Sequence, residues 1–115
     1  MKSIIVNVFV AAGLMVAGSA MAVDMPPVAK KNNCTACHNI DKKGVGPSWM
    51  DISKKYKGVT TFKFAGAEHP IQDGLALKVK KGGSGSFGSM PMPANPKVSD
   101  ADMKEMITFV LGLAQ

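Results

Sequence analysis

The stretch Cys34-Thr35-Ala36-Cys37-His38 decides how the rest of this sequence is interpreted. It has the form C-x-x-C-H, the pattern by which c-type haem is attached to a polypeptide. Two thiols about one helical turn apart can add to the two vinyl groups of the porphyrin, and the adjacent histidine is then held under the iron. The motif therefore predicts one covalent haem, with Cys34 and Cys37 as thioether attachment points and His38 as an axial iron ligand.

Other uses of a C-x-x-C pair fit this sequence less well. A thioredoxin-like redox pair belongs in a βαβ unit, and the chain shows no such context. A zinc site would need ligands beyond the two cysteines and the only other histidine, His69. A disulfide between cysteines three residues apart would close a tiny loop and restrain the unfolded chain very little. Haem is the interpretation that uses every part of the motif.

The N-terminus has the pattern of a cleaved secretory signal. Lys2 supplies a positive start, an apolar stretch runs from Ile4 to Ala17, and Ala20-Met21-Ala22 has the small-residue form of a cleavage site. We expect residues 1–22 to be removed after Ala22, leaving residues 23–115 as a single small domain in the bacterial periplasm. A retained membrane anchor is the alternative, because the apolar run comes close to the length that spans a bilayer.

The charge of the predicted mature domain is positive. Of the 14 basic residues in the whole chain only Lys2 precedes residue 23, so 13 lysines face eight acidic residues and leave a formal charge of +5. A positive surface attracts acidic patches on other proteins and speeds their association. Since export separates the domain from nucleic acid, we expect protein partners with acidic docking patches, no stable membrane insertion and a monomer.

The mature sequence favours an all-α fold. Helices are expected from Pro26 toward Cys34, from Met50 to Tyr56, from Pro70 to Lys80 and from Ser99 to Leu113. The last is the clearest, because Ser99 and Asp102 fit a capping box ahead of an apolar stripe at helical spacing. No convincing alternating pattern of a β-strand is evident.

The second axial ligand decides between electron transfer and small-molecule binding, because an open iron position permits gas binding or peroxidase chemistry. Six of the nine methionines follow Ala22, and three of these lie in predicted helices where core packing explains them. Met25 is next to the expected N-terminus, which leaves Met90 and Met92. Proline on both sides of Met92 stiffens its backbone and favours it over Met90. A lysine or His69 is a further alternative.

An imidazole bound to iron usually donates a hydrogen bond from its other nitrogen, and this contact fixes the ring. The best candidate acceptor is the carbonyl of Pro47 in Val45-Gly46-Pro47. An ordinary turn proline is the alternative interpretation of this residue.

Together, the C-T-A-C-H motif, the V-G-P that follows it, the Pro-Met-Pro-Ala-Asn stretch beginning at Pro91 and the V-S-D-A-D opening of the last helix resemble a class I cytochrome c. The similarity is strongest to the small bacterial monohaem c-551/c-552 subgroup and extends over most of the mature chain. The resemblance implies a small cytochrome c fold of about four helices around one haem. It implies His38 and Met92 as axial ligands and Pro47 as the acceptor for His38.

The sequence departs from this family at two places, Phe87 and the stretch 58–73, and Lys78 is a further position to compare with it. Family members usually carry a tryptophan, whose N–H reaches a haem propionate, where this chain has Phe87; phenylalanine cannot donate. Lys78 falls where a basic residue often lies close to a propionate, although a solvated helix lysine is the alternative. The stretch 58–73 is longer than the family pattern, and we expect His69 within it to be a surface or capping residue.

The expected function is periplasmic one-electron transfer between respiratory redox partners, with iron cycling between Fe(II) and Fe(III), and no enzymatic activity of the domain's own. Methionine ligation stabilises the ferrous state and raises the haem potential. A haem sensor or a peroxidase is the alternative from another class. A sensor would need an open iron position. A peroxidase would also need acid-base groups on the distal side of the haem, and His69 is the only candidate for them in the sequence.

Overall fold

The computed structural model describes residues 23–115, and the expected signal segment 1–22 lies outside the described residues. Four α-helices occupy this part of the chain: α1 (Pro27–Lys31), α2 (Trp49–Lys55), α3 (Ile71–Lys81) and α4 (Asp100–Gly112). A short 3-10 helix, η1 (Cys34–Ala36), follows α1. The four helices lie within a few residues of the predicted ranges, so the mainly helical fold is confirmed.

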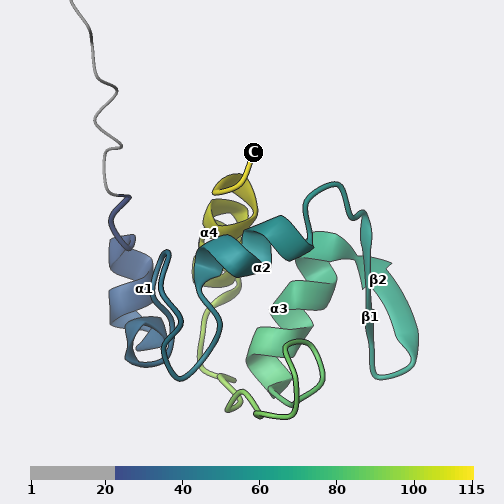
Figure 1. Cartoon of the computed structure of the whole chain (residues 1–115). Helices are drawn as coiled ribbons and strands as arrows, with labels where there is room; N and C mark the ends of the chain where they lie inside the picture. Colours follow the sequence, from purple (N-terminus) through teal and green to yellow (C-terminus); the bar gives the residue numbers. More distant parts are fainter. Residues whose placement is uncertain (1–22) are drawn as a thin grey trace, which may run out of the picture.

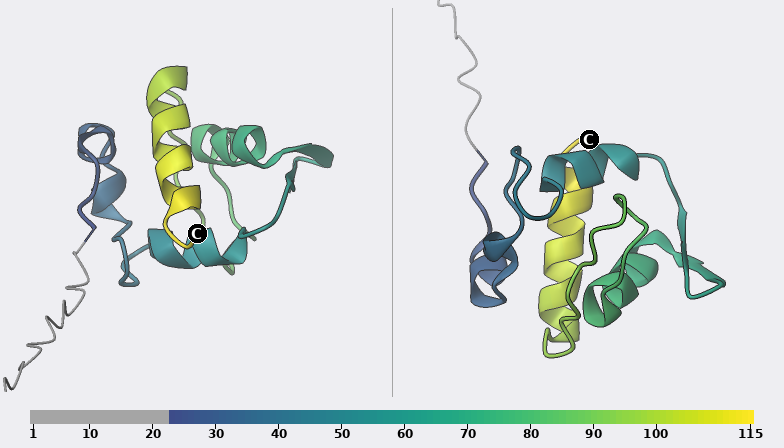
Figure 2. Two further views of the ribbon diagram at one scale, coloured as in Figure 1. Left: turned by 90° about the horizontal axis from the view of Figure 1, so that it is seen from above. Right: turned by 60° about the horizontal axis from the view of Figure 1, so that its bottom comes forward.

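Helix α4 is the centre of the arrangement. It lies between α1 on one side and α3 on the other, and α2 crosses near its C-terminal end (Figures 1 and 2). Its N-terminus is capped as predicted, because the Ser99 hydroxyl accepts a hydrogen bond from the Asp102 N–H at 3.2 Å. The buried apolar cluster gathers around this helix and consists of Val28, Ala29, Trp49, Leu75, Val98, Met103, Met106, Ile107 and Val110.

Helix α2 is fixed to the end of α4 by a buried serine. The Ser53 hydroxyl donates to the carbonyl of Leu111 at 3.2 Å and accepts from the N–H of Ala114 at 2.9 Å. Ser53 is fully buried, so these bonds replace the water that its hydroxyl would otherwise bind. Ser48 caps the start of the helix by accepting from the Asp51 N–H. Helix α2 therefore begins one residue earlier than predicted and buries Trp49, which the helical pattern did not single out.

The expectation of no strands was wrong. An antiparallel hairpin joins β1 (Thr61–Phe64) to β2 (Ala67–Pro70), with Phe62 opposite His69. The turn between them consists of Ala65 and Gly66, which both have positive φ angles, 50° and 82°, and these values fit the two-residue turn of a tight hairpin. The hairpin lies beside α3 at the edge of the molecule (Figure 1).

The hairpin is joined to the core by one aromatic side chain. Phe62 packs edge to face against Tyr56, with ring centroids 5.6 Å apart. It also covers Gly74 on α3, where an added Cβ would lie 2.7 Å from the Cβ of Phe62. The glycine thus permits close packing of the hairpin on the helix.

Candidate functional site

The C-x-x-C-H motif forms a compact turn around η1. Asn33 enters it with a left-handed backbone, φ 59°, and the N–H groups of Cys37 and His38 both donate to the carbonyl of Cys34. The two cysteines are free thiols, both partly buried. They line the same cavity, of about 460 Å³, which the motif, α2, α3, α4 and the loop between α3 and α4 enclose. The motif therefore presents both of its thiols to one space.

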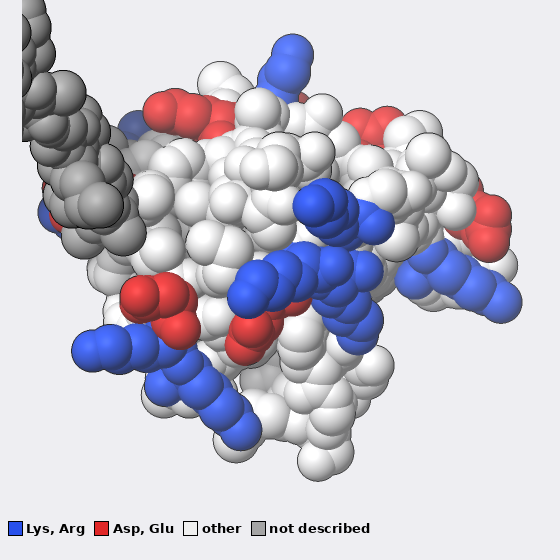
Figure 3. All heavy atoms as spheres, turned by 45° about the horizontal axis from the view of Figure 1, so that its top comes forward, with Lys and Arg blue, Asp and Glu red and all other residues white. Residues whose placement is uncertain are grey.

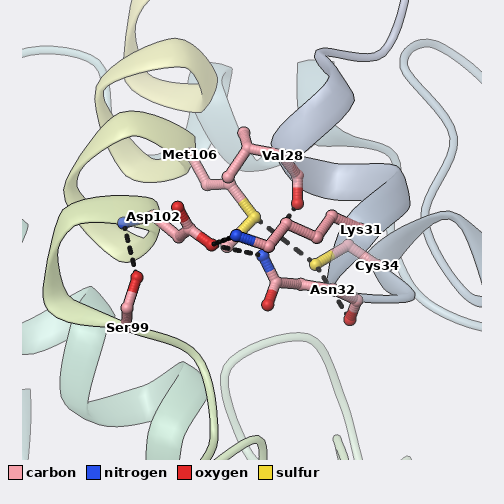
Figure 4. A network of polar contacts seen from close by, with 7 residues as sticks. All are labelled: Val28, Lys31, Asn32, Cys34, Ser99, Asp102 and Met106. Atoms are coloured by element: carbon pink, nitrogen blue, oxygen red, sulfur yellow. Dashed lines mark hydrogen bonds and ion pairs between the residues drawn. The ribbon is translucent and has the colours of Figure 1, made fainter.

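The Cys34 thiol is held close to α4 (Figure 4). Its sulfur lies 3.5 Å from the sulfur of Met106, and burial raises the pKa of the thiol. On the neighbouring turn, the carboxylate of Asp102 accepts from the Asn32 amide at 3.2 Å and pairs with Lys31 at 3.2 Å. These contacts join α1 and the motif to α4, so the attachment site is fixed against the central helix.

His38 is buried, with 8% of its surface exposed. Its Nδ1 lies 2.8 Å from the carbonyl oxygen of Pro47, and because a carbonyl can only accept, Nδ1 carries the proton. In the neutral ring with this tautomer, the other nitrogen, Nε2, has a free lone pair, which is the form of imidazole that binds a metal. His38 also lines the cavity. The structure thus brings His38 and Pro47 together in the predicted contact.

Two glycines allow the chain to pass this closely around the histidine. An added Cβ on Gly46 would lie 2.9 Å from Cε1 and 3.1 Å from Nδ1 of His38. An added Cβ on Gly44 would lie 3.0 Å from the carbonyl oxygen of Cys37. The Gly46 N–H donates to that same carbonyl at 2.9 Å. The segment that supplies the Pro47 carbonyl is therefore folded tightly onto the motif.

The two candidate methionines differ in their surroundings. Met92 is partly buried, whereas 65% of the Met90 surface is exposed, and both residues contribute to the cavity lining. Met92 forms a two-bond bridge with Gly83, whose N–H donates at 2.9 Å and whose carbonyl accepts at 3.0 Å. Next to it, Gly82 has φ 69°, and an added Cβ there would collide with the Met92 carbonyl oxygen. The backbone of Met92 is thus fixed at the end of α3.

Of the remaining residues that the sequence singled out, two line the cavity and one does not. Lys78 lines it, and its ammonium donates to the carbonyl of Gly83 at 2.6 Å. Burial lowers the pKa of Lys78. Phe87 also lines the cavity and is 37% exposed. His69 is partly buried on β2 and does not belong to the cavity lining, so the distal group considered for a peroxidase is not at the site.

Trp49 is a site residue that sequence reasoning missed. It is 4% exposed, lines the cavity and packs edge to face with Phe109 at 5.8 Å. Met106 belongs to the core as predicted, and its sulfur also lies next to that of Cys34. Met25, expected to lie at a free end, packs against the core cluster but does not line the cavity. Only the position of Trp49 directly after a helix-capping serine offered a signal that could have found it.

The donor set fits a haem. Two thiols, an imidazole nitrogen and a thioether line one cavity, whose remaining wall is mostly aliphatic and aromatic. A porphyrin needs such a wall, because its faces are apolar while its iron takes nitrogen and sulfur ligands. The family model for cytochrome c matches residues 27–114. The chain belongs to the cytochrome c family.

Individual cytochromes support this assignment. Cytochrome c-552 of Nitrosomonas europaea is 43% identical over 113 residues, which cover 98% of this chain and 99% of the relative. Cytochrome c-551 of Allochromatium vinosum is 40% identical over 100 residues, 87% of this chain and 95% of the relative. The crystal structure of the wild-type Nitrosomonas europaea protein aligns with a TM-score of 0.61 at 44% identity, covering 75% of this chain and 95% of that one.

The chain is therefore a small c-type cytochrome of the kind that carries electrons on covalently bound haem c. Its C-x-x-C-H motif lies inside the matched region, with both cysteines on the cavity. Among residues 23–115, no helix combines the length and the apolar composition that crossing a bilayer would require.

Proposed function

We propose that residues 23–115 form a periplasmic shuttle that moves single electrons between respiratory partners, with His38 and Met92 as the axial ligands of its haem. The observation that carries the proposal is that Cys34, Cys37, His38 and Met92 line the same cavity. When bound, haem c supplies one-electron chemistry by alternating between Fe(II) and Fe(III). The roles of the polypeptide are attachment, ligation and control of the surroundings.

On the histidine side, the protein fixes the ring before ligation. The Pro47 carbonyl orients the Nδ1 proton and raises the basicity of Nε2. Gly46 lets the backbone touch the ring edge, so the ring has little freedom to rotate. Such a ligand changes little between oxidation states, which keeps the reorganisation that accompanies electron transfer small.

On the methionine side, the support is backbone geometry. Pro91 and Pro93 restrict the chain on both sides of Met92, and the bridge to Gly83 anchors it to the end of α3. A thioether presented by a fixed backbone loses little entropy when it binds a metal. The soft neutral sulfur favours Fe(II), so we expect a relatively high potential. Met90 lacks the bridge and is mostly exposed, which is why we assign ligation to Met92.

The surface offers a place for brief docking. Val45, Phe87 and Met90 are exposed and also line the cavity, so an apolar rim lies where the cavity meets solvent. Lys43 and Lys78 are the lysines of the cavity lining. On the face drawn in Figure 3, lysine and acidic side chains lie beside one another. An apolar rim with Lys43 and Lys78 in the lining of the same cavity suits a short-lived complex with an acidic redox protein.

The test compares two methionine variants of the haem-loaded protein. We expect Met92→Ala to lose the weak far-red absorption band of methionine-ligated ferric haem, whereas the matched variant Met90→Ala keeps it. Persistence of the band without Met92, or its absence from the wild type, would overturn the assignment. Mass spectrometry of the periplasmic fraction checks the export part of the proposal, because we expect the mature chain to begin at Val23.

A further inference from the structure

The loop between α3 and α4 closes on itself at its base. Gly83 and Met92 are joined there by two backbone hydrogen bonds, and the residues between them, 84–91, form what we call the loop apex. The backbone hydrogen bond of the apex lies inside it, from the Gly85 N–H to the Gly88 carbonyl. In the described part of the chain, no backbone hydrogen bond joins the apex to a helix. Side chains must therefore hold the apex in place.

Lys55 supplies the contact with α2. Its ammonium donates a hydrogen bond to the carbonyl oxygen of Ser86, 31 residues further along the chain. The same ammonium lies 4.4 Å from the centroid of the Phe87 ring, within the range of a cation–π interaction. One cation thus contacts two successive residues of the apex. The ring of Phe87 cannot donate a hydrogen bond, but its face attracts the Lys55 charge.

The base from which Lys55 reaches is rigid. Lys55 is the last residue of α2, and Ser53, two residues earlier, is fully buried and hydrogen-bonded to the end of α4. A second lysine that contacts the loop, Lys78 on α3, acts at a different place. Its strong contact is with Gly83 at the base of the loop, and its distance to the Ser84 carbonyl is a long 3.5 Å.

The apex is also a wall of the haem cavity. Ser86, Phe87, Met90 and Pro91 all belong to the lining, whereas Lys55 does not. A change at Lys55 can reach the cavity through the apex or through Tyr56, whose ring centroid lies 5.7 Å from the Lys55 ammonium and which also lines the cavity. Amide exchange of the apex is therefore the readout that separates the two routes. Because Met92 follows the apex directly, a free apex would also give the Met92 side of the cavity more motion and more access for water.

We propose that Lys55 is a positioning residue that latches the loop apex to α2, keeping the cavity wall closed and the Met92 sulfur in place. The inference rests on the proposed function in so far as Met92 is the iron ligand. Breaking the latch exposes that ligand to competitors, since an external base can bind only after the sulfur has left the iron.

The test uses the haem-loaded protein and three variants. Lys55→Met keeps most of the unbranched side chain but removes the ammonium, and Lys55→Arg retains a cation that can make both contacts. Lys54→Met is the matched control, because Lys54 is exposed and adjacent, and its ammonium makes no hydrogen bond or ion pair within residues 23–115. The first readout is the rate at which imidazole replaces the sixth ligand of the ferric form. The second is hydrogen exchange of the amides in residues 84–91.

For Lys55→Met we expect imidazole binding about three- to tenfold faster than in wild type, the range that an exposed charged contact of this kind supports. Faster exchange should be confined to residues 84–91, and Lys55→Arg should restore both values. If Lys55→Met and Lys54→Met had the same imidazole binding rate and the same amide exchange in residues 84–91, the proposed role of Lys55 would be wrong. If the wild type lacked methionine ligation, the proposed function would fail, while amide exchange of the apex would still decide the latch.

Discussion

Replacing Gly46 by alanine tests how closely the polypeptide surrounds the His38 ring. The added methyl carbon would lie 2.9 Å from Cε1 and 3.1 Å from Nδ1. Carbon atoms in favourable contact are about 3.5–4.0 Å apart, so the ring or the backbone would have to move by roughly 0.5–1 Å. The His38 ring has little room to move, because its Nδ1 is hydrogen-bonded to the Pro47 carbonyl at 2.8 Å. Its backbone is also held by the neighbouring Cys37, a predicted point of haem attachment.

The expected cost follows from this crowding. Overfilling a packed site typically destabilises a protein by about 1–3 kcal/mol. For a domain of this size, each kcal/mol corresponds to a shift in Tm of about 4–8 °C. The backbone of Gly46 is not in the left-handed region, so the alanine adds crowding without backbone strain. The same displacement should lengthen the bond to Pro47 and change the magnetic environment of the His38 ring.

Urea and thermal unfolding of the haem-loaded protein, followed by circular dichroism, measure the stability change. Gly112→Ala is the matched control, because an added Cβ there meets nothing within 4 Å. Both variants lose the same conformational freedom in the unfolded chain, so their difference isolates the contact with His38. Equal stabilities, together with unchanged NMR shifts of the His38 ring, would refute the argument that Gly46 is needed for close approach.

Two further substitutions test contacts between helices. Ser53→Ala should destabilise the protein by about 1–3 kcal/mol in urea unfolding, because the fully buried hydroxyl is lost and the N–H of the partly buried Ala114 loses its acceptor. Asp102→Asn should lower stability at neutral pH, since the Asn32 amide and Lys31 hold the pKa of this carboxyl below its usual value. A lowered folded-state pKa means that stabilisation is present above about pH 4 and is lost as the pH falls through the folded value. The difference in free energy of unfolding between wild type and Asp102→Asn should therefore decrease toward zero at acidic pH. Urea unfolding at a series of pH values measures this difference.

Exposed residues of the same types provide the controls. Ser89→Ala removes a hydroxyl that is exposed, and it should leave stability unchanged. Asp41→Asn removes a charge that forms no ion pair within residues 23–115. If Ser89→Ala lowered the free energy of unfolding as much as Ser53→Ala does, the explanation based on the buried Ser53 hydroxyl would be wrong. A gap between Asp102→Asn and wild type that stayed constant down to the lowest pH would contradict the account of the carboxylate.

Local signals predicted the parts of the structure that depend on local physics. The Ser99 cap fixes the start of α4, and the apolar stripe that follows it fixes the buried face, including Met103 and Met106. The contact between His38 and Pro47 was expected for another reason. The sequence alone left an ordinary turn proline open, and the resemblance to class I cytochromes c implied that Pro47 is the acceptor. Spacing thus carries most of the information for the helix, and the family pattern carries it for the turn.

The hairpin could not be found in the same way. Thr61-Phe62-Lys63-Phe64 alternates, but four residues are too few to outweigh chance. Its turn has Ala65 in a left-handed conformation, where asparagine, aspartate or glycine is the usual signal. What stabilises the hairpin is the packing of Phe62 against Tyr56 and Gly74, which lies outside the segment. A structure that depends on such contacts has a weak local signature.

The cavity and the hydrophobic core of this small domain share much of their lining. The wall of the cavity and the buried cluster are largely the same side chains, namely Trp49, Leu75, Met103, Met106, Ile107 and Val110. Each of these residues is at most 9% exposed, and each also forms part of the cavity wall. A chain of this length buries comparatively little apolar surface on folding, so a bound apolar group adds usefully to its stability. Haem c would fill the cavity that these side chains line, so we expect the group that carries the electron to complete the core as well.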